Sequence, residues 1–388
     1  MDAIELLDII STGETSKVQF KREITHNDSM AAEIAAMSNS IGGLILLGVV
    51  DKTGEIIGID VKSGINERIA NISTNNLNPP VYINTEVVSI DNELFSKVLV
   101  IHIPGGTNKP YKDNNGAIWV KQGSDKRRVT DNAEIMRLFQ QSGNLLADEM
   151  EVHGTSFADV NEKAFAEYFM KEFNKTFVER GLTFEQALRA KKVLRNNQLT
   201  LAGLLFFGYD PQGIKPAFTI KAVSYFGNDI AGNQYRSKPK DLTGTIPELF
   251  EKGIDFLKSN LDYIQSGESF NTQGKLEVSN VALEELLQNA LVHRDYFKNS
   301  PIRLLIFDNR IEIISPGKLP NSLTVEDIKF GNPVIRNNQL VAFSTHTLPF
   351  SGLGSGVKRA LEEEPNIELI NDVDGEQFKV IIPRPEKK

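Results

Sequence analysis

The sequence contains no cysteine, which excludes disulfide bonds and thiolate metal sites and is consistent with a reducing cytoplasm. It also lacks any apolar run near the roughly 20 residues that a membrane-spanning helix requires. Its acidic start has neither the basic residues nor the long apolar segment of a secretory signal. Positive charge is not in excess, because the net charge is −8, so any nucleic-acid contact must come from a local basic patch. We therefore expect a soluble, cytoplasmic protein.

The chain is long and has the composition of a folded protein. Its 388 residues exceed the roughly 250 to 300 at which a single core usually divides, and 40% of them are hydrophobic. Short β-branched segments alternate with helical patterns, and polar stretches interrupt them near residues 141–159 and 266–274. We predict a multi-domain α+β protein with an N-terminal α+β domain, a middle α/β domain and a C-terminal α/β sandwich, at residues 1–140, 141–275 and 276–388.

The segment 283–296, LEELLQNALVHRDY, carries the densest chemistry of the chain. On a helix, Glu285, Asn289 and His293 recur every four residues and share one face beside apolar leucines. Buried polar side chains are costly unless they are satisfied, so this stripe is either a closed hydrogen-bond network or part of a ligand pocket. In a pocket, Glu285 could orient or deprotonate a water molecule, and Asn289 could offer its amide oxygen to Mg²⁺.

A glycine-rich turn, Gly352 to Gly356, precedes a predicted helix at 357–363 and includes Gly354 and Ser355. Backbone N–H groups at such a turn, together with the positive end of the helix, suit a phosphate chain, and Lys358 lies in the first helical turn. A plain flexible loop is the alternative interpretation. Arg294 has two interpretations as well, a phosphate partner or a structural ion pair with Asp295 or Glu285, and we favour the ion pair.

These motifs together resemble those of the GHKL ATPases, the superfamily of gyrases and histidine kinases. More narrowly, the segments NALVHRDY (289–296), EIISPGKLP (312–320) and GSG (354–356) look like the divergent ATPase-like module of bacterial transcriptional regulators and RecG-like proteins. The resemblance implies Glu285 as general base and Asn289 as Mg²⁺ ligand. It also implies ATP as the nucleotide, with Gly317 at the base edge. The remaining nucleotide-binding positions that it implies are His293, Gly352, Gly354, Ser355, Gly356 and Lys358.

The chain departs from the wider ATPase family where an aspartate normally accepts a hydrogen bond from the adenine amino group. The turn reads Ser315-Pro316-Gly317 instead. Loss of a hydrogen bond to a charged group costs about 1.5 to 3 kcal/mol, roughly tenfold to a hundredfold in affinity. The pocket is therefore expected to bind adenine more weakly than its relatives do, or to bind a different base.

The N-terminal third resembles the Schlafen-type AlbA domain, through the pattern GETxxxQFK (13–21), the segment IAAMSNSIGG (34–43) and Asp51 after LLGV. With LAGLLFFG (201–208), the likeness extends over nearly the whole chain. Some Schlafen relatives cut RNA with a carboxylate-held metal, which implies an alternative nuclease site at Glu14, Gln19 and Asp51. Gln19 replaces the usual second glutamate and lacks its charge, so we favour binding over cleavage.

Basic and aromatic residues are interleaved in the segment 109–128, as suits phosphate contact with base stacking. A solvated surface diluted by Asp113 and Asp125 is the alternative. The predicted nucleic-acid contacts are Lys17, Lys21, Arg22, Lys109, Tyr111, Lys112, Trp119, Lys121, Lys126, Arg127 and Arg128.

We therefore predict an ATP- and Mg²⁺-responsive, homo-oligomeric regulator that binds DNA or RNA, with weak ATP hydrolysis as a possible activity. The rival interpretations are a metal-dependent Schlafen-like nuclease and a non-enzymatic scaffold whose ATPase fold has lost its ligand.

Overall fold

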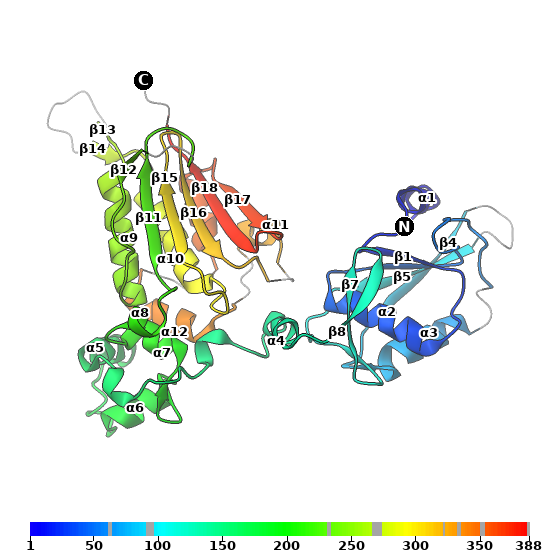
Figure 1. Cartoon of the computed structure of the whole chain (residues 1–388), viewed down its shortest axis with the longest axis horizontal. Coiled ribbons are helices and arrows are strands. Elements are labelled where there is room, and N and C mark those ends of the chain that lie inside the picture. Colours follow the sequence, from blue (N-terminus) through cyan, green and yellow to red (C-terminus); the bar gives the residue numbers. More distant parts are fainter. Residues whose placement is uncertain are drawn as a thin grey trace. The chain divides into compact units, whose positions relative to one another are not determined.

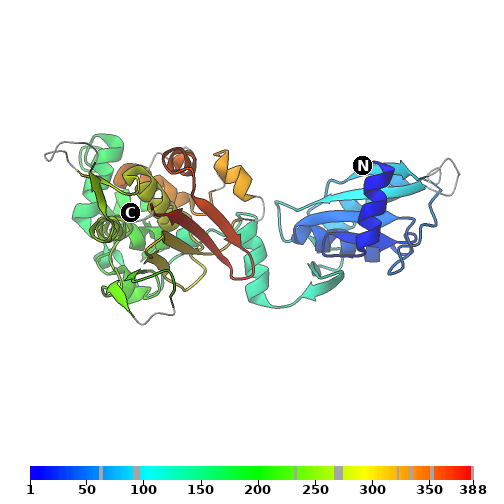
Figure 2. The same cartoon turned by 90° about the horizontal axis from the view of Figure 1, so that it is seen from above.

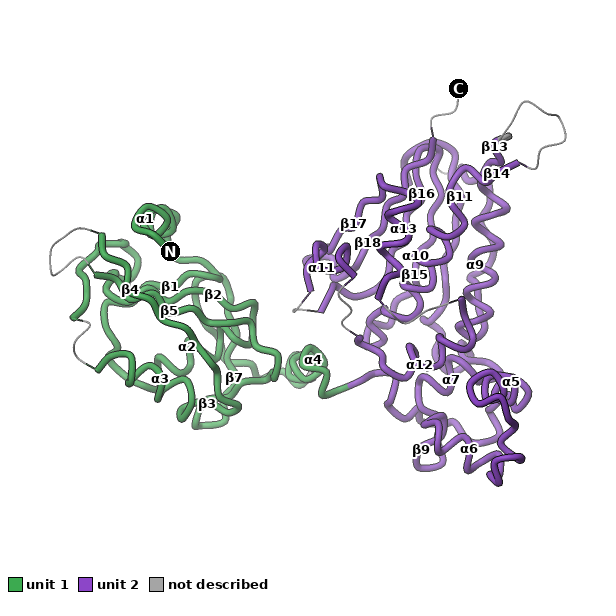
Figure 3. Tube along the Cα trace, turned by 180° about the vertical axis from the view of Figure 1, so that it is seen from behind, with its two compact units in different colours: residues 1–145 green, residues 146–388 purple. Residues whose placement is uncertain are grey.

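The structure is a computed structural model of the chain, and it forms two compact units, Met1–Leu145 and Leu146–Lys388 (Figure 3). No helix in the parts described is both long and apolar enough to cross a bilayer. The structure describes residues 1–60, 64–90, 97–230, 234–265, 274–320, 323–331, 335–349 and 354–385.

The first unit is built on a four-stranded sheet with apolar layers on both faces. The central strand β5 is a continuous apolar run because alternate side chains face opposite sides: Val98 and Val100 face α1, whereas Leu99 and Ile101 face α2 and α3. In Figure 2 helix α1 crosses one face of this sheet. The sheet order is β1 (Val18–Lys21), β2 (Gly42–Leu47), β5 (Lys97–Pro104), β4 (Asn84–Ser89), and the helices are α1 (Ala3–Thr12), α2 (Asn27–Asn39) and α3 (Ile65–Asn75).

A second small sheet packs against α2 and carries most of the predicted basic segment. Asn39, at the end of α2, joins the two: its amide donates to the carbonyls of Tyr111 and Trp119, both at 2.8 Å, and accepts from the Tyr111 N–H. Strand β7 therefore lies along α2. The sheet order is β3 (Leu77–Asn78), β6 (Lys112–Asp113), β7 (Ile118–Gln122), β8 (Asp125–Val129), followed by α4 (Asn132–Gln141).

The second unit contains a six-stranded mixed sheet with three helices on one face (Figure 1). Strands β11 and β15 pair in parallel, and the other neighbours are antiparallel. The α+β fold class is thereby confirmed. The sheet order is β12 (Tyr235–Ser237), β11 (Ile220–Tyr225), β15 (Ile302–Ile306), β16 (Arg310–Pro316), β18 (Gln377–Pro383), β17 (Glu368–Asp372), and the covering helices are α9 (Ile246–Asn260), α10 (Asn280–His293) and α13 (Gly356–Glu363).

Helices α5, α7 and α12 of the second unit pack around an aromatic cluster in which Tyr168 and Phe207 contact Phe343, and further short helices and hairpins complete the unit. Residues 201–207 form a helix, which the Thr200 hydroxyl caps by accepting from the Gly203 N–H. These elements are η1 (Ala147–Glu149), η2 (Phe157–Asp159), α5 (Glu162–Phe173), α6 (Phe184–Ala190), β9 (Leu194–Arg195), β10 (Gln198–Leu199), α7 (Leu201–Phe207), α8 (Pro211–Ile214), β13 (Tyr263–Gln265), β14 (Gly274–Leu276), α11 (Val325–Lys329) and α12 (Asn338–Thr347).

The predicted boundary near residue 275 falls inside this second unit. Strand β11 from the middle segment pairs with β15 from the C-terminal segment, and one apolar core runs through both. Helix α12 also packs on α5 and α7, which come from the middle segment. A sheet shared by two sequence segments unites them, whereas the polar stretch at 266–274 suggested a division.

Candidate functional site

Helix α10 forms one wall of a cavity of about 140 Å³ in the second unit. Its leucines pack into the core, and the polar stripe lies toward the cavity, which Asn289 and His293 line. Glu285 lies one turn before Asn289 and is not part of the lining. The cavity is bounded mainly by aliphatic side chains of α10, α11, α13 and the strands β16, β17 and β18; its lining residues are Leu286, Asn289, Ala290, His293, Ile313, Ser315, Gly317, Lys318, Leu319, Pro320, Leu323, Ile328, Arg336, Gly354, Val357, Leu369, Phe378 and Val380.

Glu285 is buried and forms an ion pair with Arg359 of α13. Burial raises the pKa of the Glu285 carboxyl group, and the nearby guanidinium of Arg359 opposes that increase. A raised pKa suits a proton acceptor, but the ion pair directs this carboxylate toward α13 in the conformation seen here.

Asn289 and Gly356 join α10 to α13. The Asn289 amide nitrogen donates to the Glu285 carbonyl oxygen at 2.7 Å, which turns the amide oxygen away from that carbonyl. A Cβ atom at Gly356 would overlap Glu285 Oε2 and lie 3.2 Å from Asn289 Nδ2, so a glycine is required for this close approach. An amide oxygen is a ligand that Mg²⁺ accepts, so Asn289 fits the metal-binding role that the resemblance implies.

The opposite end of the cavity is a tight turn at Gly317. The φ angle of Gly317 is +99°, and a Cβ atom there would overlap the Asp295 Cβ atom. Arg336 donates to the Lys318 carbonyl oxygen at 2.7 Å. Burial, with the charge of Arg336, lowers the pKa of His293 to about 4, so its imidazole is neutral at pH 7.

The other predicted residues divide between the cavity and its surroundings. Gly354 lines the cavity, Ser355 is the residue before α13, and Lys358 is exposed on α13 outside the lining. Gly352 lies outside the described residues. Arg294 is buried, and its guanidinium donates to the carbonyls of residues 298 and 300 while lying over two aromatic rings, which is a structural role.

Two cations of this site, Arg336 and Arg359, were absent from the predicted set. Arg359 follows the glycine-rich turn by three residues, so its place on the first turn of α13 was a usable signal. Arg336 sits in a polar segment without periodicity, and nothing in its sequence context marks it as part of a pocket.

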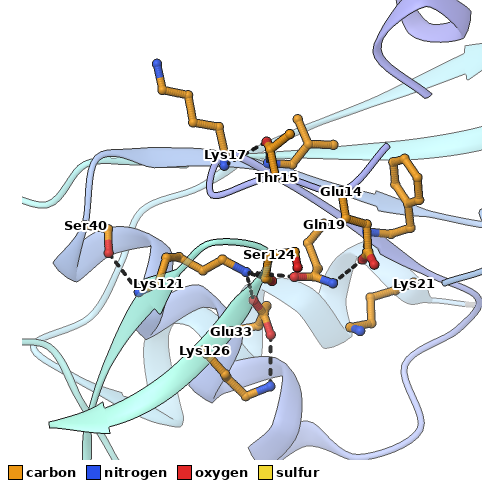
Figure 4. A network of polar contacts seen from close by, with 12 residues as sticks. Glu14, Thr15, Lys17, Gln19, Lys21, Glu33, Ser40, Lys121, Ser124 and Lys126 are labelled. Carbon is orange, nitrogen blue, oxygen red and sulfur yellow. Dashed lines mark hydrogen bonds and ion pairs between the residues drawn. The ribbon is translucent and has the colours of Figure 1, made fainter. Parts of the chain in front are cut away.

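The first unit contains a closed polar network that joins β1, α2, β7 and β8 (Figure 4). The Lys121 ammonium group, whose side chain is 1% exposed, donates to Gln19 Oε1 at 2.8 Å, Glu33 Oε1 at 2.9 Å and the Ser124 carbonyl at 2.5 Å. Lys126 binds the second oxygen of Glu33 at 2.9 Å. Burial alone would raise the pKa of Glu33, but these two ammonium groups hold it below its usual value.

The predicted nuclease trio is only partly assembled. Glu14 accepts hydrogen bonds from the Gln19 amide and from the Phe20 N–H, whereas Asp51 is paired with Lys21 at 3.0 Å. Within the described ranges, no three His, Cys, Asp or Glu side chains are placed to hold a metal ion. Lys21 neutralises Asp51, and the Gln19 amide oxygen already accepts from Lys121, so these residues do not fit a catalytic divalent metal.

The predicted basic patch is smaller on the surface than in the sequence. Lys109 and Tyr111 are buried, and Lys109 donates to the Ser40 carbonyl at 2.6 Å. Trp119 donates to Asp113, and Arg127 is bound through two nitrogens by Glu134. Lys121 and Lys126 belong to the closed network, and Lys21 forms the ion pair with Asp51. The predicted cations left on the surface are Lys17, Arg22 and Arg128, with Lys112 half-buried; Figure 4 shows Lys17 pointing away from the network.

Three protein families match the chain in succession. The Schlafen AlbA_2 family matches residues 14–130, a domain of unknown function matches residues 136–219, and the family described as "Putative ATP-dependent DNA helicase recG C-terminal" matches residues 299–382. No curated protein matches the chain. A solved structure, the DIP2311 protein from Corynebacterium diphtheriae, is similar at 22% sequence identity over 99% of this chain and 80% of that one, with a TM-score of 0.48.

The chain thus carries a Schlafen AlbA_2 domain followed by a RecG C-terminal-like, ATPase-like domain, as the resemblance had indicated. The match to the RecG C-terminal-like family begins at residue 299, after the end of α10. Asn289 and His293 lie before the matched residues, but they line the same cavity as Gly317, which lies within them.

Proposed function

We propose that the protein is a nucleotide-responsive, nucleic-acid-binding regulator, in which a nucleoside triphosphate with Mg²⁺ occupies the cavity beside α10. The observation that supports this most is the convergence of Asn289, His293, Gly317 and Gly354 on one cavity. ATP is the first nucleotide to test, because it is the one that the resemblance implies. Weak hydrolysis would require Arg359 to release Glu285, whose carboxylate could then accept a proton from water.

The proposed regulatory step is a shift between two arrangements of α13. In the structure Gly356 and Arg359 hold α13 against α10. A nucleotide that interacts better with one position of α13 than with another changes their populations by its differential affinity.

Nucleotide binding is tested by a thermal-shift titration with ATP and Mg²⁺. A ligand that binds only the native state raises the melting temperature, so the wild type should shift and Asn289→Ala should shift less. Asn280→Ala is the matched control, because Asn280 is an exposed asparagine at the start of the same helix. Equal shifts for all three proteins would remove Asn289 from the site, and no shift in any of them would favour the scaffold interpretation.

Nucleic-acid binding is proposed for the first unit through the exposed cations Lys17, Arg22 and Arg128. Fluorescence anisotropy with labelled DNA and RNA should show affinity that falls with salt, and a Lys17→Ala, Arg22→Ala, Arg128→Ala variant should bind more weakly with a smaller salt slope. A triple alanine variant at the exposed Lys163, Lys171 and Lys175 of the second unit removes the same charge and should retain binding. Equal losses in both variants would indicate only a general charge effect.

A cytoplasmic location and a homo-oligomeric state belong to the same proposal. The first rests on a chain without cysteine, and the second on the resemblance. Light scattering with and without ATP-Mg²⁺ measures the oligomeric state, and a monomer under both conditions would contradict it.

A further inference from the structure

The cavity lining is uneven in charge. Two cations, Lys318 and Arg336, line it, whereas no aspartate or glutamate does among the residues placed by the structure. The neutral polar groups are Asn289, Ser315 and His293, and the rest of the lining is mostly aliphatic. A ligand buried here therefore meets hydrogen-bond donors more often than acceptors.

The acceptors near the Gly317 turn are already engaged. The Lys318 carbonyl accepts from Arg336 at 2.7 Å, and the Pro316 carbonyl accepts from the Asp295 N–H at 2.8 Å. The Asp295 side chain packs against the Gly317 turn, but its carboxylate accepts from the Phe297 N–H and does not line the cavity. Arg336 carries five N–H donors: the contact with Lys318 uses one of them, and the charge of Asp295 acts on the same guanidinium group.

The two ends of the site along helix α10, at Glu285 and at His293, differ in chemistry. Glu285 and His293 are eight residues apart, which is about 12 Å along a helix. Gly356 and Arg359 lie at the Glu285 end, where backbone N–H groups of a helix start suit phosphates. The Gly317 turn lies with His293 and Arg336 at the other end, which leaves that end for the base.

We propose that this end selects a base that presents acceptors, namely a 6-oxopurine such as guanine or hypoxanthine, over adenine. The oxygen at position 6 and the nitrogen at position 7 of these bases form a pair of acceptors that an arginine can bind through two N–H groups. Adenine places an amino donor at position 6, where it would face the Arg336 donors. This inference rests on the proposed nucleotide function and adds the base class to it.

The experiment measures dissociation constants of GTP, ITP and ATP for the full chain with Mg²⁺, by calorimetry. ITP shares oxygen 6 and nitrogen 7 with GTP but lacks the 2-amino group, so it isolates the proposed contact. GTP and ITP should bind at least about tenfold more tightly than ATP, as expected for hydrogen bonds to a charged group. Arg336→Met should abolish the preference. Because Arg336 also supports the turn, Ser315→Asp provides a second test, since an added carboxylate should shift the preference toward ATP.

Arg359→Met is the control, because Arg359 lies at the Glu285 end and its loss should weaken all three nucleotides to a similar degree. ATP binding as tightly as ITP to the wild type would overturn the base preference and leave the nucleotide function standing. An unchanged ratio in a folded Arg336→Met or Ser315→Asp variant would overturn it as well. No binding of any of the three nucleotides would remove the proposed function, and the preference with it.

Discussion

The network of the first unit and the cavity of the second use the same kinds of group in opposite ways. Around Glu33, two lysines satisfy a carboxylate that is 3% exposed, and the Gln19 amide oxygen accepts from one of these lysines. Around α10, Arg359 forms an ion pair with the buried Glu285, and a cavity remains beside Asn289. A carboxylate, an amide and a cation thus form a structural clamp when their contacts are complete, and a candidate binding site when space is left beside them.

The two carboxylates also differ in the direction of their pKa shifts. Ammonium groups hold the pKa of Glu33 below its usual value, whereas burial raises the pKa of Glu285. The fold therefore favours the charged form of the first and disfavours the charged form of the second.

The largest expected effect comes from Lys121→Met in the first unit. The variant removes one cation from the buried Glu33 and the donor that Gln19 and Ser124 share, so the free energy of unfolding should fall by about 3 kcal/mol. Trp119, the sole tryptophan, lies in the same unit, and its fluorescence in a urea titration reports that unit separately.

The control for this change is Lys112→Met, which removes a half-buried lysine of the same unit from outside the network. The free energy of unfolding of this control, measured in the same urea titration, should stay within about 0.5 kcal/mol of the wild-type value. A Lys121→Met midpoint equal to that of the control would mean that the network is not a stabilising clamp.

An intermediate effect is expected for Gly356→Ala in the second unit. The added methyl group overlaps Glu285 Oε2, so either this carboxylate must shift within its ion pair with Arg359 or α13 must move, at a cost of about 1 to 3 kcal/mol. The melting temperature followed by circular dichroism should fall, and the nucleotide-induced shift should shrink. Glu362→Ala on the exposed side of the same helix should change neither quantity, and equal behaviour of the two variants would contradict the close contact.

The smallest expected effect is on the dependence of stability on pH, and it has opposite signs in the two units. The lowered pKa of Glu33 adds stability above its ordinary value of 4.5, and this contribution is lost as the pH falls through the folded-state pKa. The raised pKa of Glu285 gives stability that is full below 4.5 and is lost as the pH rises through the folded-state pKa.

Glu33→Gln and Glu285→Gln should each remove one of these two pH-dependent contributions to the free energy of unfolding. The contribution of Glu285 should be about 1 kcal/mol or less, because Arg359 offsets part of the effect of burial. Unfolding free energies between pH 3 and pH 7 measure both. For each variant, the difference in unfolding free energy from the wild type can be plotted against pH. Slopes of the same sign in the two plots would refute the contrast between the units.

Local patterns predicted the elements and part of the site. The four-residue spacing along α10 predicted the shared face of Asn289 and His293, and the structure places both beside Gly317 and Gly354. The fold class and the two domain families followed from motifs whose order is local to each segment. The shared sheet of the second unit did not follow, because strand pairing between distant segments leaves no period in the sequence.

The sequence by itself determined which segments form helices and strands, because hydrophobic periodicity and capping residues act within a few residues of one another. The tertiary structure alone decided which charges are neutralised. Lys121 and Glu33 are 88 residues apart in the chain, and a buried lysine looks in a sequence like one at the surface. The pairing of Glu285 with Arg359, and the place of Arg336 beside the Gly317 turn, depend on contacts between elements in the same way, because Coulomb interactions follow distance in space and not along the chain.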